Sequence, residues 1–462
     1  MRCIIGLIDM LPDDILLAIF DFCVEEDYIG RKPSLEAWQI LVHVCRRWRS
    51  LVFASPRRLD LRLVSSGGTP AKDTLDIWPA LLLLVECYND VERLENVDNI
   101  IAVLERSNRL REIELLKVSS SDLETIFAAM QVPFPELTRL RLSSCEETVP
   151  ILPDSFLGGT ALPLQELYVC GIPFPALPKL LLSATRLVQL YLRDIPHSAY
   201  ISPEVMVTTL STLTSLEKLQ LEFQSPRSRP SRESGRPPPR KRLVLPVLTF
   251  FSFKGVGEYL DDLVDRIDAP RLNKLYITFF NQIVFDTPKS IQFISRTPTL
   301  GLLKNAEVTF WNSATFISVK SQISHLEVAI PCEELDWQVS SVEQVFTSCL
   351  PSLPLLEDLY ISESQYQQPD WQDNIENTLW LELLHPFTAV ENLYLSEDFA
   401  RRIVPALQEL DGGRATEVLP TLKNIFLEGL QPSGSVQEAI GQFVATRQAA
   451  GDPVVVSRWD RS

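Results

Sequence analysis

A short pattern, apolar-x-x-apolar-x-apolar, recurs along most of the chain and constrains its fold more than any other feature. The stretches LTRLRL, LVQLYL and VENLYL show it in its plainest form. The pattern starts at Leu110, Leu137, Leu164, Leu187, Leu216, Leu248, Leu272, Leu303, Ile323, Leu356, Val390 and Leu422. A strand this short cannot bury its own leucines, so the strands must stack on one another. The pattern therefore predicts an α/β fold, in which a curved parallel sheet carries helices on its convex face.

The starts are on average about 28 residues apart, within the range of about 20–29 residues that is typical of leucine-rich repeats. The array resembles that family. Its one departure is the asparagine or cysteine expected three residues after the last leucine, which is absent from nearly every repeat. We therefore expect an irregular solenoid over residues 61–462, closed by a last strand in PVVVSRWD.

One position in each repeat points away from the core, between the last two apolar residues, and should line the concave face. Aromatic residues recur there: Tyr168, Tyr191, Tyr276, Tyr360, Tyr394 and Phe426. Two interpretations stay open. Aromatic side chains favour strands, and they also supply large contact areas at protein interfaces. On the second interpretation these six residues bind a target protein, and the acidic Glu307 and Glu327 divide them into two blocks.

Two stretches near the start of the chain, LPDDILLAIFDFC and VHVCRRWRSLVFASP, look unlike the repeats. A proline in the first turn and two aspartates behind it predict that a helix begins at Leu11 and Pro12. A later helix should carry one continuous apolar stripe from Trp38 to Val52, through Cys45 and Trp48. Arg46, Arg47 and Arg49 would form its solvated side. So short a segment has little core of its own, which favours docking to a partner.

These residues resemble an F-box, the module by which substrate receptors attach to the Skp-type adaptor of cullin–RING ubiquitin ligases. The resemblance covers roughly residues 10–56, and together with the repeats it is closest to the fungal F-box and leucine-rich-repeat type. It implies a docking module at residues 1–60. It also implies adaptor contacts from Leu11, Pro12, Ile15, Leu16, Ile19, Phe20, Cys45 and Trp48.

Between two repeats lies SPRSRPSRESGRPPPRKR, residues 225–242, which is rich in arginine and proline. Such a composition cannot form a packed core and predicts a disordered loop. A plain linker is the favoured interpretation. A nuclear-import signal or a phosphate contact around RKR is the other.

Composition excludes several classes of partner. The 462 residues include 43 Lys plus Arg against 60 Asp plus Glu, a net charge of −17. Nucleic acid and anionic membranes favour basic surfaces, so neither is expected as a partner. No apolar run approaches the roughly 18 residues of a membrane helix. The eight cysteines are scattered, as in proteins of reducing compartments. We expect a soluble protein of the cytoplasm, the nucleus or both.

No motif predicts catalysis. The four histidines, His43, His197, His325 and His385, have no metal-ligand spacing, and no phosphate loop or nucleophile motif occurs. We therefore expect neither an enzyme nor a bound metal or cofactor. Two hypotheses remain. The first is a receptor that binds the Skp-type adaptor, and through it a cullin, and presents a protein target of unknown identity for ubiquitination. The second is a non-catalytic scaffold unrelated to ubiquitin, with a leucine-rich GTPase activator as a weaker third possibility.

Overall fold

The computed structural model describes most of the chain. The described residues are 11–25, 37–55, 62–65, 75, 82–88, 97–144, 146, 148–229, 241–280, 287–348, 350, 356–369, 371, 375–410, 414, 416–429 and 435–460. They group into two compact units, residues 1–187 and 188–462. Most of the predicted basic loop, residues 230–240, lies outside the described residues.

Unit 1 begins with a helical module, which consists of α2 (Asp13–Glu25), α3 (Ala37–Val44) and α4 (Arg46–Ala54). Pro12 precedes α2, and its carbonyl accepts the amide of Leu16 at 3.0 Å, so the helix starts where the sequence predicts. Leu16 and Phe20 are fully buried, and the ring of Phe20 packs on Trp48 with 4.8 Å between centroids. The module therefore has a small core of its own.

The predicted continuous helix from Trp38 to Val52 is wrong, because the chain breaks at Cys45. The backbone of Cys45 is extended (φ −157°, ψ 170°), and its Sγ accepts the amide of Trp48 at 3.4 Å. Cys45 thus caps α4 in the manner of a serine, with a weaker acceptor. A stripe of apolar residues cannot reveal such a break, because the helical spacing of these residues continues on both sides of Cys45.

The remainder of unit 1 is an array of parallel strands with helices between them. Its elements are β1 (Arg62–Ser65), β2 (Leu82–Tyr88), α6 (Val97–Leu104), β3 (Leu110–Leu116), α7 (Ser120–Ala129), β4 (Arg139–Ser143), η1 (Phe156–Gly159), β5 (Glu166–Cys170) and α8 (Leu177–Leu181). The predicted leucines Leu137, Leu140 and Leu142 are buried, as the repeat pattern requires.

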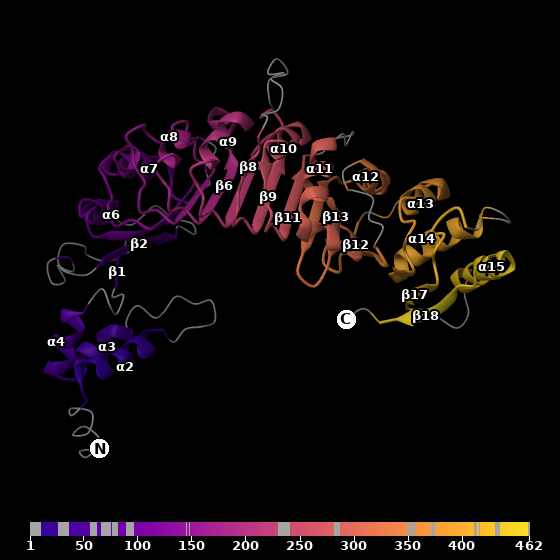
Figure 1. The fold of residues 1–462 in the computed structure, drawn as a ribbon, viewed down its shortest axis with the longest axis horizontal. Coiled ribbons are helices and arrows are strands. Elements are labelled where there is room, and N and C mark those ends of the chain that lie inside the picture. The colour runs from indigo at the N-terminus through magenta and orange to yellow at the C-terminus, as the bar shows by residue number, and fades with distance from the viewer. Residues whose placement is uncertain are drawn as a thin grey trace. The chain divides into compact units, whose positions relative to one another are not determined.

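Unit 2 continues the same plan with more strands, and Figure 1 shows its helices along one side of its sheet. Its first half contains β6 (Gln189–Ile195), η2 (His197–Ala199), α9 (Pro203–Leu210), β7 (Lys218–Phe223), β8 (Leu243–Val244), β9 (Phe250–Gly255), α10 (Gly257–Val264), β10 (Ile267–Asp268), β11 (Lys274–Phe279), α11 (Pro288–Arg296) and η3 (Pro298–Leu302). Its second half contains β12 (Asn305–Phe310), β13 (Ala314–Lys320), β14 (His325–Pro331), α12 (Leu335–Ser348), β15 (Asp358–Glu363), α13 (Asn377–Leu384), β16 (Asn392–Leu395), α14 (Glu397–Gln408), β17 (Asn424–Glu428), α15 (Ser435–Ala450) and β18 (Val455–Trp459).

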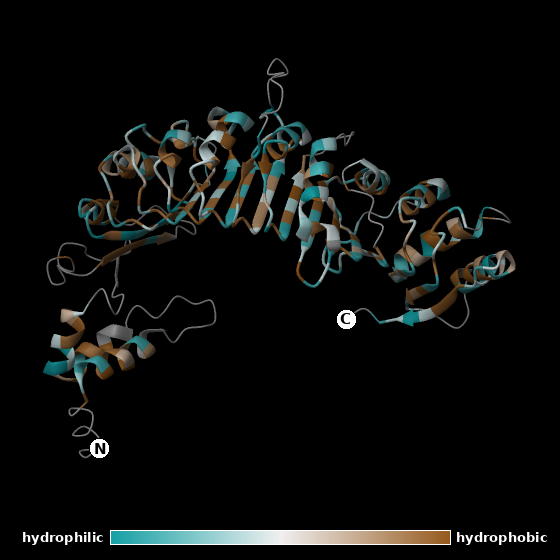
Figure 2. Ribbon diagram, in the orientation of Figure 1, coloured by the Kyte–Doolittle hydropathy of each residue, from teal (hydrophilic) through white to brown (hydrophobic). Residues whose placement is uncertain are grey.

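Side chains alternate along these strands between a buried face and an open face. In β7, Leu219 and Leu221 are buried, whereas Gln220 between them is partly exposed. Figure 2 shows the result as bands of opposite hydropathy on neighbouring residues of the strands. The helices pack on the buried face, so the core of unit 2 lies between the sheet and the helices. We call the other side of the sheet the open face.

The prediction of an all-parallel sheet is wrong at one place. In unit 2 the strand order is β6-β7-β9-β11-β14-β13-β12-β15-β16-β17-β18. Strand β13 pairs antiparallel with both β12 and β14, so the three form a meander inside an otherwise parallel sheet. The connections at residues 311–313 and 321–324 are too short for a crossover helix, which forces the chain to turn back. The predicted repeat start Ile323 lies in the second turn and is 63% exposed.

Candidate functional site

The predicted concave positions form one continuous row on the open face of unit 2. Register places them side by side on successive strands, in an order set by the meander. The row runs Tyr191, Gln220, Ser252, Tyr276, Glu327, Ser318, Glu307, Tyr360, Tyr394, Phe426 and Ser457. The predicted residues are all partly exposed rather than core. Glu327 and Glu307 do separate Tyr276 from Tyr360, with Ser318 between them.

Three members of this row stack as an aromatic ladder, Tyr360, Tyr394 and Phe426. The first two rings lie 4.1 Å apart at 11°, and the second pair lies 4.5 Å apart at 8°. Parallel in-register strands produce this geometry, because equivalent residues on neighbours project side by side. Burial raises the pKa of the Tyr360 hydroxyl, and the neighbouring Tyr394 raises it further.

Trp459, near the end of β18, packs against this ladder from the edge strand. Its ring lies 5.6 Å from Tyr394 in a T-shaped contact and 5.9 Å from Tyr360. The repeat pattern did not predict Trp459 as a site residue, because it lies two residues beyond the position that continues the row. Its distance from Tyr360 in sequence leaves no local signal of the contact.

The other predicted tyrosines have local partners of their own. In unit 1, Tyr168 lies under the guanidinium of Arg141 at 5.1 Å, and Arg141 also pairs with Glu114 at 2.8 Å. In unit 2, the Tyr191 hydroxyl donates to Gln189 at 2.8 Å. These tyrosines belong to polar networks on their strands, whereas the aromatic ladder is built of ring contacts.

Tyr276 belongs to a polar cluster around His325. The hydroxyl of Tyr276 lies 3.1 Å from Nδ1 of the histidine, and Ser318 Oγ lies 2.8 Å from Nε2. Burial lowers the pKa of His325, and Lys320 and Lys274 on the flanking strands lower it further. Burial also raises the pKa of Glu327, which lies 3.6 Å from the ring. The histidine is held on both nitrogens and orients its neighbours.

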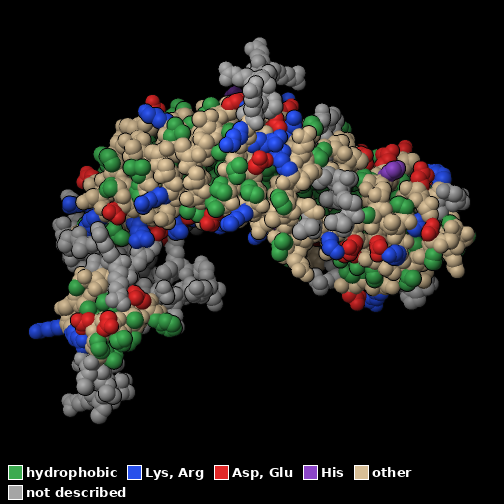
Figure 3. Space-filling view, in the orientation of Figure 1, with side chains coloured by type: hydrophobic (Ala, Val, Ile, Leu, Met, Phe, Trp, Pro, Cys, Tyr) green, Lys and Arg blue, Asp and Glu red, His purple; other side chains and the backbone are tan. Residues whose placement is uncertain are grey.

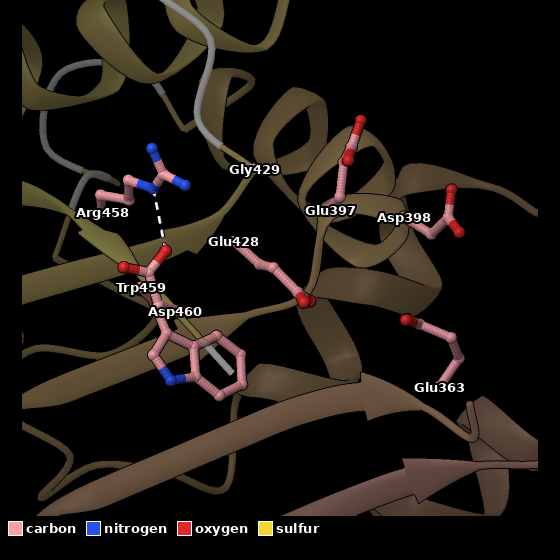
Figure 4. Close-up of a pocket in the computed structure, with 8 residues that line it drawn as sticks. All are labelled: Glu363, Glu397, Asp398, Glu428, Gly429, Arg458, Trp459 and Asp460. Carbon is pink, nitrogen blue, oxygen red and sulfur yellow. Dashed lines mark hydrogen bonds and ion pairs between the residues drawn. The ribbon is translucent and has the colours of Figure 1, made fainter. Parts of the chain in front are cut away.

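Two hollows flank Trp459. The first, the tyrosine hollow, measures about 410 Å³ and is lined by Asn305, Ala306, Glu307, Lys320, Tyr360, Ser362 and Trp459. The second, the acidic hollow, measures about 450 Å³ and is lined by Glu363, Glu397, Asp398, Glu428, Gly429, Arg458, Trp459 and Asp460. Figure 4 shows the side chains of Glu363 and Glu428 reaching toward each other across it. Trp459 is common to both.

Local chemistry explains why carboxylates gather at the acidic hollow. Glu397 and Asp398 occupy the first turn of α14, where the helix dipole favours negative charge. Gly429 has a φ of +64°, and a Cβ there would lie 2.7 Å from Glu397 Oε2. The positive φ favours a glycine in this turn, and the absence of a side chain leaves room for the carboxylate of Glu397.

The first residues of β15, β16 and β17 form a second ladder, of hydrogen-bonded polar side chains, which was not predicted from the sequence. The amide of Asn392 donates to Asp358 at 2.7 Å, and the amide of Asn424 donates to Asn392 at 2.7 Å. The recurrence of Asp or Asn two residues after each repeat start, in LEDLYI, VENLYL and LKNIFL, was the available signal. This ladder fixes the register on which the aromatic ladder depends.

The predicted adaptor-binding residues fall into two groups, buried and exposed, in the helical module. Leu16 and Phe20 are fully buried in the module itself, and therefore offer no surface to a partner in this conformation. Ile15 and Ile19 are exposed, Pro12 is exposed, and Leu11, Cys45 and Trp48 are partly exposed. The role of all eight in adaptor binding stays a prediction.

More large apolar side chains are exposed on the module than the predicted Ile15 and Ile19. Phe22 is 68% exposed one turn beyond Ile19, and on α3 Ile40 is 66% exposed with Val44 one turn further on. Figure 3 shows hydrophobic side chains at the surface of this module. Spacings of three and four residues place Ile15, Ile19 and Phe22 on one side of α2.

Arg47 has a structural role that was not predicted. Its Nη2 donates to the carbonyl of Leu11 and to Oδ1 of Asp13, both at 2.6 Å. It thereby ties α4 to the start of α2, where a solvated arginine was expected. Because 34 residues separate Arg47 from Asp13, local sequence patterns cannot predict this pair.

Within the part of the chain that the structure describes, no three His, Cys, Asp or Glu side chains are grouped so as to hold a metal ion. Among the same residues, no helix has the length and apolar character required to cross a membrane. Cys45, Cys87 and Cys332 are free thiols.

Taken together, the strand register and the burial pattern define a mixed α/β repeat protein with a predominantly parallel sheet, of leucine-rich-repeat-like organisation. No family model matches the sequence, and no curated protein matches it. Among solved structures, the chain is similar to the leucine-rich repeat-containing protein LegL7 from Legionella pneumophila, at 13% identity and a TM-score of 0.29. The alignment covers 85% of this chain and 99% of that one. So distant a likeness adds nothing to what the strands themselves establish.

Proposed function

We propose that this chain is the substrate receptor of a Skp–cullin–F-box ubiquitin ligase. In this proposal the helical module binds the Skp-type adaptor, and through it a cullin, while the repeat array binds a protein target. The receptor carries out no chemistry and uses no cofactor. It raises the local concentration of its target near the conjugating enzyme, in the cytoplasm, the nucleus or both.

The observation that carries the proposal is the apolar face that α2 exposes, together with the exposed apolar side chains of α3. Five large apolar side chains lie exposed on α2 and α3: Ile15, Ile19, Phe22, Ile40 and Val44. Singly exposed apolar residues are ordinary, but a group of them on so small a module is typical of a protein interface. The buried pair Leu16 and Phe20 holds the helices that present this face.

The open face of unit 2 supports the second half of the proposal. Tyrosine and tryptophan are frequent among the residues that dominate binding energy at interfaces. The aromatic ladder and Trp459 place three such rings, together with that of Phe426, on the open face of the sheet.

The adaptor half can be tested with purified full-length chain and a purified Skp-type adaptor, by isothermal titration calorimetry. Ile15→Asp with Ile19→Asp puts two charges into the proposed interface, and we expect at least about tenfold weaker binding, since truncating one central anchor already costs about 2 kcal/mol. Phe20→Ala is a poor test, because it removes the packing of Phe20 on Trp48.

The control is Ile323→Asp, which replaces an isoleucine of unit 2 that is exposed by 63%, compared with 45% for Ile15 and 40% for Ile19. It should bind the adaptor as the parent does. Equal binding by the double variant and the parent would reject the proposed interface. If the parent itself fails to bind the adaptor, the proposal fails and the scaffold hypothesis remains.

A further inference from the structure

Trp459 separates two hollows of different character, and this arrangement restricts what can bind there. On the side of the tyrosine hollow, Glu307 is paired with Lys320 at 2.8 Å, so that side carries little net charge. The residues that line the acidic hollow include five carboxylates and one arginine. A ligand that lies across Trp459 therefore meets aromatic rings first and an excess of negative charge beyond them.

The carboxylates of the acidic hollow are partly engaged already. Arg458 pairs with Asp460 at 2.9 Å, and Arg401 on α14 pairs with Glu397 and lies 3.8 Å from Asp398. Glu363 accepts a hydrogen bond from the hydroxyl of Ser396. Among the described residues, the formal charges are five carboxylates against these two guanidinium groups, and an added cation would offset part of this excess.

Trp459, which is not stacked face to face as the three ladder rings are, favours the same kind of ligand. The face of an aromatic ring attracts a cationic group by cation–π interaction, and tryptophan does so most strongly. The chain shows this geometry elsewhere, since Arg402 lies 3.9 Å above the ring of Trp371 and Arg141 lies 5.1 Å from that of Tyr168. An arginine or lysine has an apolar stem that can lie on the rings while its charged end reaches the carboxylates.

We propose that Trp459, the aromatic ladder and the acidic hollow bind a basic segment of a partner protein, with an arginine or lysine side chain on the rings and its charge toward the carboxylates. This inference rests on the proposed function, since it gives the chemical class of the target that the array binds. The partner's segment is extended, because it reaches from one hollow to the other across Trp459, and it carries several positive charges, because five carboxylates line the acidic hollow.

The test uses the full chain and dye-labelled synthetic peptides, with binding followed by fluorescence anisotropy at physiological ionic strength. One peptide carries several arginines in a glycine–serine background, and its counterpart carries citrulline, which is the neutral isostere. We expect the arginine peptide to bind and the citrulline peptide to bind at least about tenfold more weakly. Trp459→Ala should weaken binding of the arginine peptide about tenfold or more, as loss of a central anchor does.

A second variant, Glu428→Gln with Asp460→Asn, removes charge without removing a ring, and should weaken the arginine peptide while leaving thermal unfolding unchanged. The matched controls are Trp337→Ala and Glu333→Gln with Glu334→Gln, whose residues are exposed at α12 or just before it. Both controls should bind as the parent does.

Three outcomes would overturn the inference: no binding of the arginine peptide, equal binding of the citrulline peptide, or equal losses in the controls. The last of these would show that net charge alone attracts the peptide. None of these outcomes affects the adaptor titration, so a failure of this inference is distinguishable from a failure of the proposed function.

Discussion

At the scale of single residues, His325 shows how the strands of the meander create a chemical environment that the sequence does not suggest. The sequence analysis treated it as an isolated histidine. The structure places Lys274 and Lys320 beside it on the two flanking strands and holds both ring nitrogens by hydroxyl groups. A neutral imidazole suits this position, whereas an imidazolium would lie partly buried between two ammonium groups.

The first prediction concerns the pH dependence of stability. The pKa of His325 is lowered in the folded state, below the value of about 6.5 in an unfolded chain. The unfolded state therefore takes up a proton first as pH falls, and stability present above pH 6.5 is lost below it. Glu327 opposes part of this, because its raised pKa favours the folded state at low pH. His325→Gln should lose less stability than the parent between pH 7.5 and 5.5.

Melting temperatures across that pH range measure the effect. His385→Gln, at an exposed histidine after α13, is the control and should follow the parent. An identical pH dependence in the parent and in His325→Gln would show that the histidine contributes nothing to it.

At the scale of elements, the sequence predicted most strands and missed one class of connection. The repeat pattern places the buried leucines correctly in β7, β15, β16 and β17, because each of these parallel strands buries one face of the sheet with the same two-residue period. Strand β13, in ATFISVK, was not predicted as a repeat, although Ala314, Ile317 and Val319 have that spacing; it pairs antiparallel and follows no helix. Its alternation alone could have suggested a strand, although not its place in the order.

The candidate site was predicted to a similar extent. The positions on the open face follow from the two-residue period of a strand, so Tyr360, Tyr394 and Phe426 could be identified. Three features could not be predicted: the contact of Trp459 with the ladder, the hydrogen bond of Arg47 to Leu11, and the break between helices at Cys45. The first two join residues far apart in sequence, and the third depends on a local backbone geometry that the apolar stripe conceals.

The second prediction compares two isoleucines in and beside β13. Ile317 is fully buried, whereas Ile323, which the repeat pattern assigns to the core, is 63% exposed. Ile317→Ala should lower the free energy of unfolding by about 2–5 kcal/mol, as truncation of a buried aliphatic side chain does. Ile323→Ala should change it by less than about 0.5 kcal/mol. Denaturant unfolding followed by circular dichroism measures both. Equal losses would contradict the meander.

At the scale of the whole molecule, the proposed adaptor and target surfaces belong to different units. The helical module is part of unit 1, and the aromatic ladder with Trp459 is part of unit 2. The receptor hypothesis requires that each surface can be lost without the other.

The third prediction follows from that separation. Tyr360→Ala with Tyr394→Ala should weaken target binding about tenfold or more while adaptor binding stays at the parental level. Proximity labelling in cells, with quantification of the adaptor and of every other enriched partner, measures both at once. Tyr366→Ala, at a tyrosine that is 91% exposed and outside the ladder, is the control.

Melting temperature decides how a loss in the double variant is interpreted. A large drop in melting temperature, with both bindings reduced in proportion, would mean that the tyrosines mainly stabilise the sheet. Unchanged stability with every partner retained would mean that the ladder is not a binding surface.

The meander has a consequence for how a chain of this kind can change its length. Because the chain reverses its direction twice in the meander, β12 and β14 run in the same direction. The parallel sheet therefore continues on both sides of the meander. An insertion of two short strands is therefore compatible with the sheet, whereas an insertion of one would leave every later strand pointing the wrong way. Each such pair moves Tyr276 and Tyr360 apart by about 9–10 Å, since strands lie about 4.7–4.9 Å apart. Gain or loss of a hairpin can thus reset the spacing between two groups of surface residues in fixed steps, without altering either group.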